Sequence, residues 1–411
     1  MARHVADSCP GVLRLHEAAD GPLARIRVPG GRVEPAQWQV LAEAARDLGD
    51  GNIELTARGN VQLRRIYDAT ALTERLAGAG LLPSRTHERV RNIVASPLSG
   101  RIGGLTNVHA LVPALDAGLL AAPRLADLPG RVLFSLDDGR GDVSGLGADI
   151  GVHAVATDDF ALLLAGGDSG IRITADDAVD VMLAAAHGFL ELRGDDPGRW
   201  RLRDLERGAE RLADLLGLSP RPDRIEFAAG QDIPIGWLEQ DDGLVGLGAG
   251  VRLGSLPART AEFLAAVERT VFVTPWRSLV VTDLEEWAAE QVVRVLAPMG
   301  LIFDADSPWL LVSACAGRPG CAKSHTDVRA DATAAVAAGR VLAPAERAER
   351  GTAHAEAKPA PRQGILDAPL LAPAEVSVAG RQHWSGCDRR CGRPRGTVTD
   401  VVATNEGYRF E

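Results

Sequence analysis

The sequence predicts an α+β protein that contains two similarly ordered halves and ends in a cysteine-rich region. Three observations support this prediction. The chain has 411 residues, more than the roughly 250–300 at which a single hydrophobic core stops growing. One order of strand and helix patterns occurs twice along it, and four of its five cysteines lie after residue 314. We therefore expect one half at residues 1–195 and a second half, with the cysteine site, at residues 196–411.

The first half begins with a strand at residues 23–28, where apolar and basic side chains alternate. Such a period of two is typical of a strand with one charged face. A helix is expected from Pro35, because the fixed φ of proline suits a first helical turn, to the glycine at position 49. The remaining elements expected in this half are strands at 53–56 and 61–66 and a helix at 72–79.

The same order of elements recurs in the second half. The expected elements are a glycine-rich strand and turn at 243–251, a helix opening at Pro257, strands at 270–274 and 278–282, a helix at 285–299, and strands at 301–304 and 309–314. Residues 56–58 can be laid over 274–277, and residues 91–97 over 309–315, which predicts an internal duplication. Helices are also expected at 176–192 and 205–216, and an exposed loop at 351–364.

Composition excludes several classes of protein. The formal charge of −10 argues against nonspecific nucleic-acid binding. No apolar run approaches the roughly 20 residues of a membrane-spanning helix, and the first residues lack the pattern of a signal peptide. We therefore expect a cytoplasmic protein without nucleic-acid or membrane partners. Five cysteines in such a chain do not indicate a disulfide framework.

Two tight cysteine pairs dominate the C-terminal region. Cys315 and Cys321 form C-x5-C, and Cys387 and Cys391 form C-x3-C. An iron–sulfur cluster needs four converging thiolates, and glycine and proline in both loops allow the backbone to wrap closely. Basic residues that could offset the cluster's negative charge are Arg318, Lys323, Arg389, Arg390 and Arg393. A structural zinc site is the alternative, although a C-x5-C pair is unusual for zinc. Cys9 stands apart and is expected in the core or a turn.

A second group of polar residues lies in the first half. Arg58, Asn60, Gln62 and Arg64 occupy alternate positions, which a strand would place on one face. Guanidinium and amide donors suit a ligand with several carboxylates, because arginine binds carboxylate with a planar two-pronged fork. Arg25 and Arg27 could extend this face from a neighbouring strand. The alternative is a solvated sheet face paired with nearby acids.

These motifs together resemble those of the sulfite and nitrite reductases that couple a 4Fe-4S cluster to sirohaem. C-x5-C followed by C-x3-C is their cluster pattern, the segment from Thr56 to Gln62 resembles their Thr-x-Arg-x-x-x-Gln, and Arg91-Asn92-Ile-Val resembles their Arg-Asn-Val. The resemblance implies duplicated ferredoxin-like halves, with the macrocycle between them and arginines such as Arg58 and Arg91 on its carboxylates. It also implies that the four cysteines ligate the cluster.

Within this group, the segments around Cys9, at 25–31, at 55–64 and at 133–139 are similar to the precorrin-3B synthase branch of aerobic cobalamin biosynthesis. That likeness implies an O2-dependent monooxygenase that hydroxylates precorrin-3A and forms a lactone, with electrons from a ferredoxin or flavoprotein. It also implies a mononuclear non-haem iron, although no 2-His-1-carboxylate spacing is readable. Catalytic residues are not assigned.

Two departures separate the chain from the reductases. Their Leu-Pro-x-Lys-x-Lys segment keeps one basic residue here, Arg131, and has Leu133 at the second position, while their Gln-x-His becomes Gln62-x-Arg64. Both changes weaken the case for sulfite or nitrite reduction, which needs cations to bind the anion and supply protons. Two alternatives stay open: a sirohaem reductase, in which Cys391 would also ligate the sirohaem iron, and a zinc-stabilised binding module.

Overall fold

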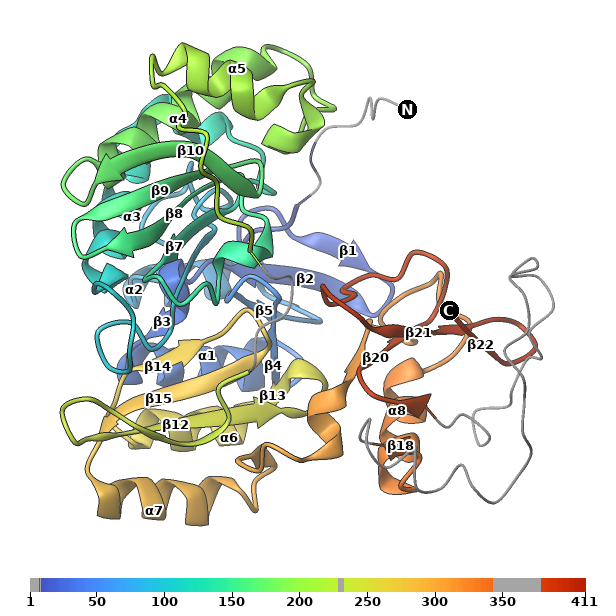
Figure 1. Ribbon diagram of the computed structural model, residues 1–411. Helices are drawn as coiled ribbons and strands as arrows, with labels where there is room; N and C mark the ends of the chain where they lie inside the picture. The colour runs from blue at the N-terminus through green and yellow to red at the C-terminus, as the bar shows by residue number, and fades with distance from the viewer. Residues whose placement is uncertain (1–6, 8, 228–232, 343–377) are drawn as a thin grey trace, which may run out of the picture. The chain divides into compact units, whose positions relative to one another are not determined.

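The computed structural model describes residues 7, 9–227, 233–342 and 378–411. The chain forms two compact units. The larger unit contains the described residues up to 303, except 18–21 and 252–254, which belong with residues 304–411 in the smaller unit (Figure 1). The helices and strands mix within both units, so the predicted α+β class is confirmed. No helix in the described part of the chain is long and apolar enough to cross a membrane.

The first half follows the predicted order. Strand β1 (His16–Ala18) precedes its repeated elements, which are β2 (Gly21–Ile26), β3 (Arg32–Val33), α1 (Pro35–Leu48), β4 (Asn52–Leu55), β5 (Val61–Leu63) and α2 (Ala69–Gly78). Pro35 occupies the first turn of α1 as expected, and Glu34 and Gln37 form a capping box there. The predicted strand at 61–66 is too long, because pairing with β2 and β4 ends at Leu63.

The second half repeats this order. After β11 (Gly236–Glu239), its elements are β12 (Val245–Val251), β13 (Ser255–Pro257), α6 (Ala258–Ala266), β14 (Val271–Val273), β15 (Ser278–Leu284), α7 (Glu286–Leu296) and β16 (Leu301–Ile302). Pro257 precedes α6 rather than opening it. The predicted duplication is therefore confirmed element by element.

The two halves exchange one strand each. One sheet has the order β1-β2-β5-β4-β13, and the other has β11-β12-β15-β14-β3 with β16 beside β12. Thus β13 of the second half pairs with β4 of the first, while β3 of the first half pairs with β14 of the second. Both repeats therefore lie in the larger unit, and the division into two compact units does not fall between residues 195 and 196. The predicted boundary between the two repeats, at residues 195 and 196, stays a prediction.

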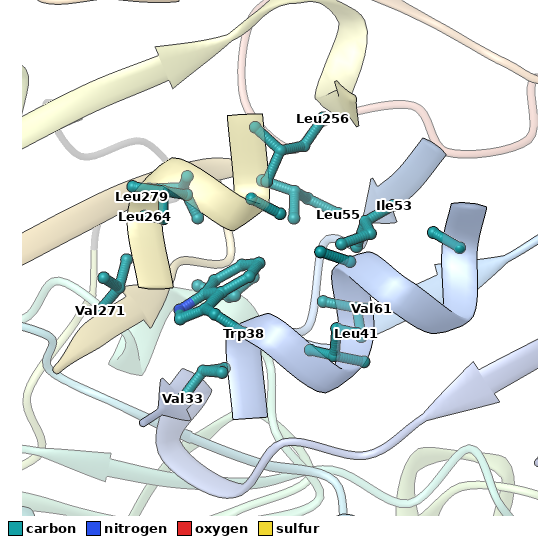
Figure 2. Close-up of a cluster of buried hydrophobic side chains, with 14 of the residues drawn as sticks. Val33, Trp38, Leu41, Ile53, Leu55, Val61, Leu256, Leu264, Val271 and Leu279 are labelled. Carbon is teal, nitrogen blue, oxygen red and sulfur yellow. The ribbon is translucent and has the colours of Figure 1, made fainter. Parts of the chain in front are cut away.

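Trp38 lies in the core that both halves build. It is fully buried, and Figure 2 shows it between α1 and α6, among apolar side chains from both halves. These neighbours are Val33, Leu41, Ile53, Leu55, Val61, Leu256, Leu264, Val271 and Leu279. Because aromatic residues are scarce, at 4% of the chain, aliphatic side chains supply most of this buried surface.

A second sheet pattern is also duplicated. The sequence predicted only the correspondence of its first strands, through the overlay of residues 91–97 on 309–315. In the larger unit the order is β10 (Gly167–Thr174), β9 (Asp159–Leu164), β8 (Ile150–Ala156), β7 (Phe134–Asp137) and β6 (Ile93–Ala95). Helices α3 (Leu111–Ala121), α4 (Ala178–Arg193) and α5 (Gly208–Leu215) contribute to its core. The β6, β7 and β8 strands are parallel, whereas β9 is antiparallel.

The smaller unit repeats that pattern in four strands. They are β17 (Val312–Ala314), β20 (Gln382–Ser385), β21 (Thr399–Ala403) and β22 (Tyr408–Phe410), and the first three are parallel. Helix α8 (Val328–Ala337) and the pair β18 (Val341–Leu342) and β19 (Val378–Ala379) complete the described unit. The predicted strand at 309–314 is wrong in its first part, where Pro308–Leu311 form a 3-10 helix. The expected loop at 351–364 lies outside the described residues.

Candidate functional site

Arg58 lies in the turn that joins β4 to β5. The turn closes through the Gly59 N–H, which donates to the Thr56 carbonyl at 3.2 Å. The half-buried Arg58 side chain donates from Nη1 to the Gly130 carbonyl at 3.5 Å. Among the residues that the structure describes, no carboxylate pairs with Arg58. This guanidinium therefore keeps its charge available for an anionic ligand.

Two further guanidiniums lie beside Cys9. Arg25 donates from Nη1 to Cys9 Sγ at 3.4 Å and from Nε to Gln62 Oε1 at 2.8 Å. Arg27 donates from Nη2 to the same sulfur, also at 3.4 Å. Arg27 is only 2% exposed, and its Nη1 has no hydrogen-bond partner in the described part of the chain. Cys9 is buried as predicted, but its sulfur joins two cations rather than only filling a core.

The arginines near Arg58 form a local excess of positive charge. Burial, followed by the repulsion of Arg201 and of Arg25 and Arg27, lowers the pKa of Arg58 to about 10, although Cys9 opposes the shift. Solvent reduces this effect, since Arg58 is half-buried. Burial likewise lowers the pKa of Arg27 to about 10. We call Arg25, Arg27, Arg58 and Arg201 the arginine cluster; Arg27 and Arg58 stay charged near pH 7, because a pKa of about 10 lies well above that pH.

The predicted alternating donors do not form one continuous strand face. Arg58 lies in the turn, Gln62 in β5, and Arg64 just beyond its end. Glu54 of β4 lies on the same side: Gln62 Nε2 donates to Glu54 Oε2 at 3.2 Å, and Arg64 Nη1 lies 3.7 Å from that oxygen. An acid from the neighbouring strand thus holds two of the four donors, as the alternative interpretation expected.

Asn60 and Arg91 are buried in the scaffold. Asn60 accepts from the Val28 N–H at 2.9 Å and donates to Asn92 Oδ1 at 3.1 Å. Arg91 forms a two-pronged pair with Asp116 of α3, at 2.7 and 2.6 Å. These contacts hold the segment that contains Arg91 and Asn92 in place. The Arg91 guanidinium is occupied by the Asp116 carboxylate.

Arg131 remains accessible at the end of the segment that departs from the reductase pattern. Its side chain is 43% exposed, and its Nε lies 3.5 Å from Asp7 Oδ1. The guanidinium stacks 4.5 Å from the Trp200 ring centre, a cation–π contact that orients it. Arg131 and Arg58 are adjacent, since Arg58 contacts the carbonyl of Gly130. Arg201, by contrast, carries no motif that sequence reasoning could have used.

The four C-terminal cysteines lie together in the smaller unit. Cys315 directly follows β17, and Cys387 follows β20 by one residue. These strands are parallel neighbours, so their ends meet at one edge of the sheet. Burial raises the pKa of Cys391, and the negative charges of Cys315, Cys387 and Cys321 raise it further while Arg389 opposes them. The structure therefore brings two segments some 65 residues apart to one place.

The two cysteine loops are packed directly on each other. The Gly386 N–H donates to Cys315 Sγ at 3.3 Å, and the His325 N–H donates to the Gly386 carbonyl at 2.9 Å. A Cβ at Gly386 would lie 1.8 Å from Ser324 Oγ, so only glycine permits this approach. Amide donors to a sulfur and thiolate ligands are the chemistry that an iron–sulfur cluster requires.

Two of the basic residues near these sulfurs are already paired. Arg390 and Arg393 bind the buried Asp400 carboxylate, and Arg318 Nε donates to the Ser324 carbonyl at 2.7 Å. The sequence interpretation, in which these side chains offset the charge of the sulfurs, is therefore incomplete, because Asp400 of β21 and Glu411, which follows β22, compete for them.

Three carboxylates in the larger unit lie close enough for a metal: Asp137, Asp138 and Asp142. Asp137, however, accepts four backbone N–H bonds, and Asp138 pairs with Arg140 at 2.9 Å. The group contains no histidine and its oxygens are engaged. It therefore does not fit the mononuclear iron that the resemblance implied, and we assign no ligands to that iron.

The carboxyl of Asp142 should make stability depend on pH. Burial, and then the charge of Asp137, raises its pKa from 3.8 to about 7. Ionisation is thus harder in the folded state, so this carboxyl's contribution to stability is complete below pH 3.8 and is lost as pH rises through 7. Asp142→Asn stays uncharged and can still accept from Ser96. In urea unfolding at pH 8, the free energy of unfolding of Asp142→Asn should be about 2–4 kcal/mol higher than that of the native chain. At pH 4 the difference should be much smaller. An equal gain at both pH values would contradict this account.

Comparisons with known proteins agree with the predicted fold. Residues 16–78 match the family model of the nitrite/sulfite reductase ferredoxin-like half domain. A ferredoxin–nitrite reductase of Synechococcus elongatus is 31% identical over 145 residues, which cover 33% of this chain and 27% of that protein. The NirA structure of Mycobacterium tuberculosis superposes with a TM-score of 0.71 at 17% identity, over 95% of this chain and 74% of that one. The chain is therefore similar to the nitrite/sulfite reductases, and residues 16–78 match their ferredoxin-like half domain.

Within this superfamily, one relative is similar along almost the whole chain. The precorrin-3B synthase of a Sinorhizobium species is 26% identical over 418 aligned positions, which cover 98% of this chain and 81% of that enzyme. These relatives are named as oxidoreductases, and the similarity of this chain extends to the precorrin-3B synthase branch that the sequence motifs indicated.

Proposed function

We propose that the chain is a precorrin-3B synthase-like monooxygenase, which binds the anionic tetrapyrrole precorrin-3A and uses O2. One oxygen atom would enter the macrocycle as a hydroxyl at C20 and the other would leave as water, with two electrons and two protons consumed. The hydroxyl and an oxygen of the ring-A carboxyl group would add across the C=C bond at C20, so that this double bond is consumed, the carboxyl proton goes to the new hydroxyl and the lactone closes without a further leaving group. The electrons would come from a ferredoxin or a flavoprotein, in keeping with the ferredoxin-dependent name of the Synechococcus relative.

The observation that carries this proposal is the unbalanced charge of the arginine cluster. Arg58 has no carboxylate partner among the described residues, and the charges of Arg201, Arg25 and Arg27 act on it. Arg201 pairs with the buried Asp149 carboxylate, so the excess charge lies on Arg25, Arg27 and Arg58. Cations brought together at such cost are stabilised when an anion binds. A ligand with several carboxylates supplies that anion, and Arg58 and Arg131 are the accessible donors. Asn60, Gln62, Arg64 and Arg91 are proposed to support the site from the partners described above.

The cysteines supply the second part of the proposal. Cys315, Cys321, Cys387 and Cys391 would hold one 4Fe-4S cluster, which when bound would relay electrons for oxygen activation. The two cysteine loops pack directly on each other, with the Gly386 N–H on Cys315 Sγ. A C-x5-C pair is unusual for zinc, so the spacing in the sequence favours a cluster over the single zinc ion of the binding-module alternative.

A sirohaem-dependent sulfite or nitrite reductase is the second candidate, because several relatives carry those names. Arg64 in place of the reductases' histidine and Leu133 in place of a lysine weaken it. The two enzymes differ in an absorption spectrum of the purified protein: a strong sirohaem Soret band would support the reductase, and broad cluster absorption alone would exclude it.

Arg58→Ala is expected to weaken precorrin-3A binding about 30-fold, the equivalent of roughly 2 kcal/mol for a lost charge-assisted contact. Anaerobic titration of the tetrapyrrole absorbance would measure it. Cluster absorption should be unchanged. Arg58→Lys keeps the charge without the fork and should recover only part of the affinity.

The matched control for this variant is Arg207→Ala. Arg207 is an exposed arginine of the same unit that pairs with Glu210, so its loss should not change the affinity. Normal binding of precorrin-3A by Arg58→Ala would show that the substrate site lies elsewhere.

A further inference from the structure

The loop that carries Cys391 is tied to the sheet by one buried carboxylate. Asp400 of β21 is only 3% exposed. Its Oδ2 accepts from Arg390 Nη1 at 3.3 Å, and Arg393 Nε lies 3.0 and 2.8 Å from its two oxygens. Arg390 and Arg393 flank Cys391, one residue before it and two residues after it. Asp400 thus holds both sides of the cysteine, and Glu411 pairs with Arg390 as well.

The rest of the loop has little regular structure of its own. Residues 386–398 form turns and bends between β20 and β21. Arg390 has a φ of 46°, in the left-handed region that non-glycine residues rarely adopt. Its N–H bonds weakly to the Cys387 carbonyl at 3.3 Å, and Arg393 Nη2 donates to the Val398 carbonyl at 3.1 Å. The guanidinium contacts therefore supply much of what fixes this backbone.

We propose that Asp400 is a positioning residue for Cys391 and that its charge also sets the reduction potential of the cluster. This inference rests on the proposed ligation of a 4Fe-4S cluster. Asp400 would act through Arg390 and Arg393 rather than by touching the cluster, as outer-shell partners orient metal ligands elsewhere.

The sign of the effect on potential follows from charge. With Asp400 ionised, the two guanidiniums beside Cys391 are partly neutralised. Asp400→Asn removes that negative charge and leaves more net positive charge next to the sulfur. The reduced cluster carries one more negative charge than the oxidised cluster, so added positive charge stabilises the reduced form. The midpoint potential should therefore rise.

Loop order can be tested without the cluster. Hydrogen exchange of the full chain, read by mass spectrometry, should be at least several-fold faster in the peptide covering 386–396 of Asp400→Asn than in the native chain. The matched control is Asp388→Asn, which removes an acid of the same loop. The Asp388 side chain is 74% exposed and pairs only with Arg409, so exchange at 386–396 should not change.

The potential is measured by redox titration of the cluster's electron paramagnetic resonance signal. Asp400→Asn should show a higher midpoint potential, and Asp400→Glu, which keeps the charge, should return towards the native value. Unchanged exchange in Asp400→Asn would overturn the positioning role. Faster exchange with an unchanged potential would overturn the electrostatic role.

Failure of the proposed function has a separate signature. A native chain with no iron or sulfide would reject the 4Fe-4S cluster, and with it the role in setting a potential, whereas the exchange measurement would still decide whether Asp400 orders the loop. Should Asp400→Asn not fold, Arg393→Lys removes the contacts of Nε with Asp400 and of Nη2 with the Val398 carbonyl, and should loosen the same peptide.

Discussion

Cys387→Ser is expected to abolish the broad visible absorption of the cluster and to reduce bound iron and acid-labile sulfide nearly to zero. Cys387 begins the loop that lies against Cys315, and a serine hydroxyl is a poor substitute for a thiolate ligand of iron. Because the four sulfurs come from two packed loops, losing one should release the whole group rather than one iron. An anaerobic spectrum with iron and sulfide analysis would measure the effect.

Cys9→Ser is the matched control for that result. Cys9 lies in the larger unit, where its sulfur accepts from Arg25 and Arg27, so its replacement should leave iron and sulfide unchanged. Full iron and sulfide content in Cys387→Ser would contradict the proposed ligand set. One zinc per native chain and no sulfide would instead support the binding module and exclude both enzymes.

Asp137→Asn is expected to destabilise the larger unit by about 3–5 kcal/mol, the usual cost of breaking a buried charge network. The Asp137 carboxylate is fully buried. It accepts from the N–H groups of residues 139, 141, 143 and 144, and His153 Nδ1 lies 3.2 Å away. An asparagine would turn an NH2 group towards some of these donors. Urea unfolding at pH 7 would measure the loss.

The loss should depend on pH. Burial alone would raise the pKa of Asp137, but the hydrogen bonds from His153 and the backbone lower it from 3.8 to about 2. The charged carboxylate therefore stabilises the fold above pH 3.8, and this stabilisation is lost as pH falls towards 2. The gap between the native chain and Asp137→Asn should narrow over that interval. Asp127→Asn, a change of an exposed acid nearby, should have almost no effect at any pH.

Local patterns predicted the repeated part of the fold well. Alternation at 23–28, Pro35 at a helix start and the helical spacing after residue 257 depend on neighbours a few positions apart. The sheet β6 to β10 was missed because its strands are buried on both faces. The sequence from Phe134 to Thr174 therefore lacks a clean alternation of apolar and polar residues.

The same difference between local spacing and distant contacts applies to the candidate site. Cysteine spacing is a local property, and it predicted which four sulfurs lie together. The alternation of Arg58, Asn60, Gln62 and Arg64 was also visible, but their partners were not. Glu54 comes from the adjacent strand, and Arg201 reaches Arg58 from more than 140 residues away in sequence. A side chain's charge is known from its type, but its neutralisation depends on which distant groups fold beside it.

By itself, the sequence determined the duplicated α+β order, the four cysteines and the superfamily to which they point, because each depends on residue type and short spacing. Only the tertiary structure decided how the repeats exchange β3 and β13, and which arginines stay available for a ligand. Strand exchange and ion pairing join residues more than two hundred positions apart. Such pairs are selected by packing of the whole chain, since a charge or a strand edge takes the partner that folding brings within a few ångströms.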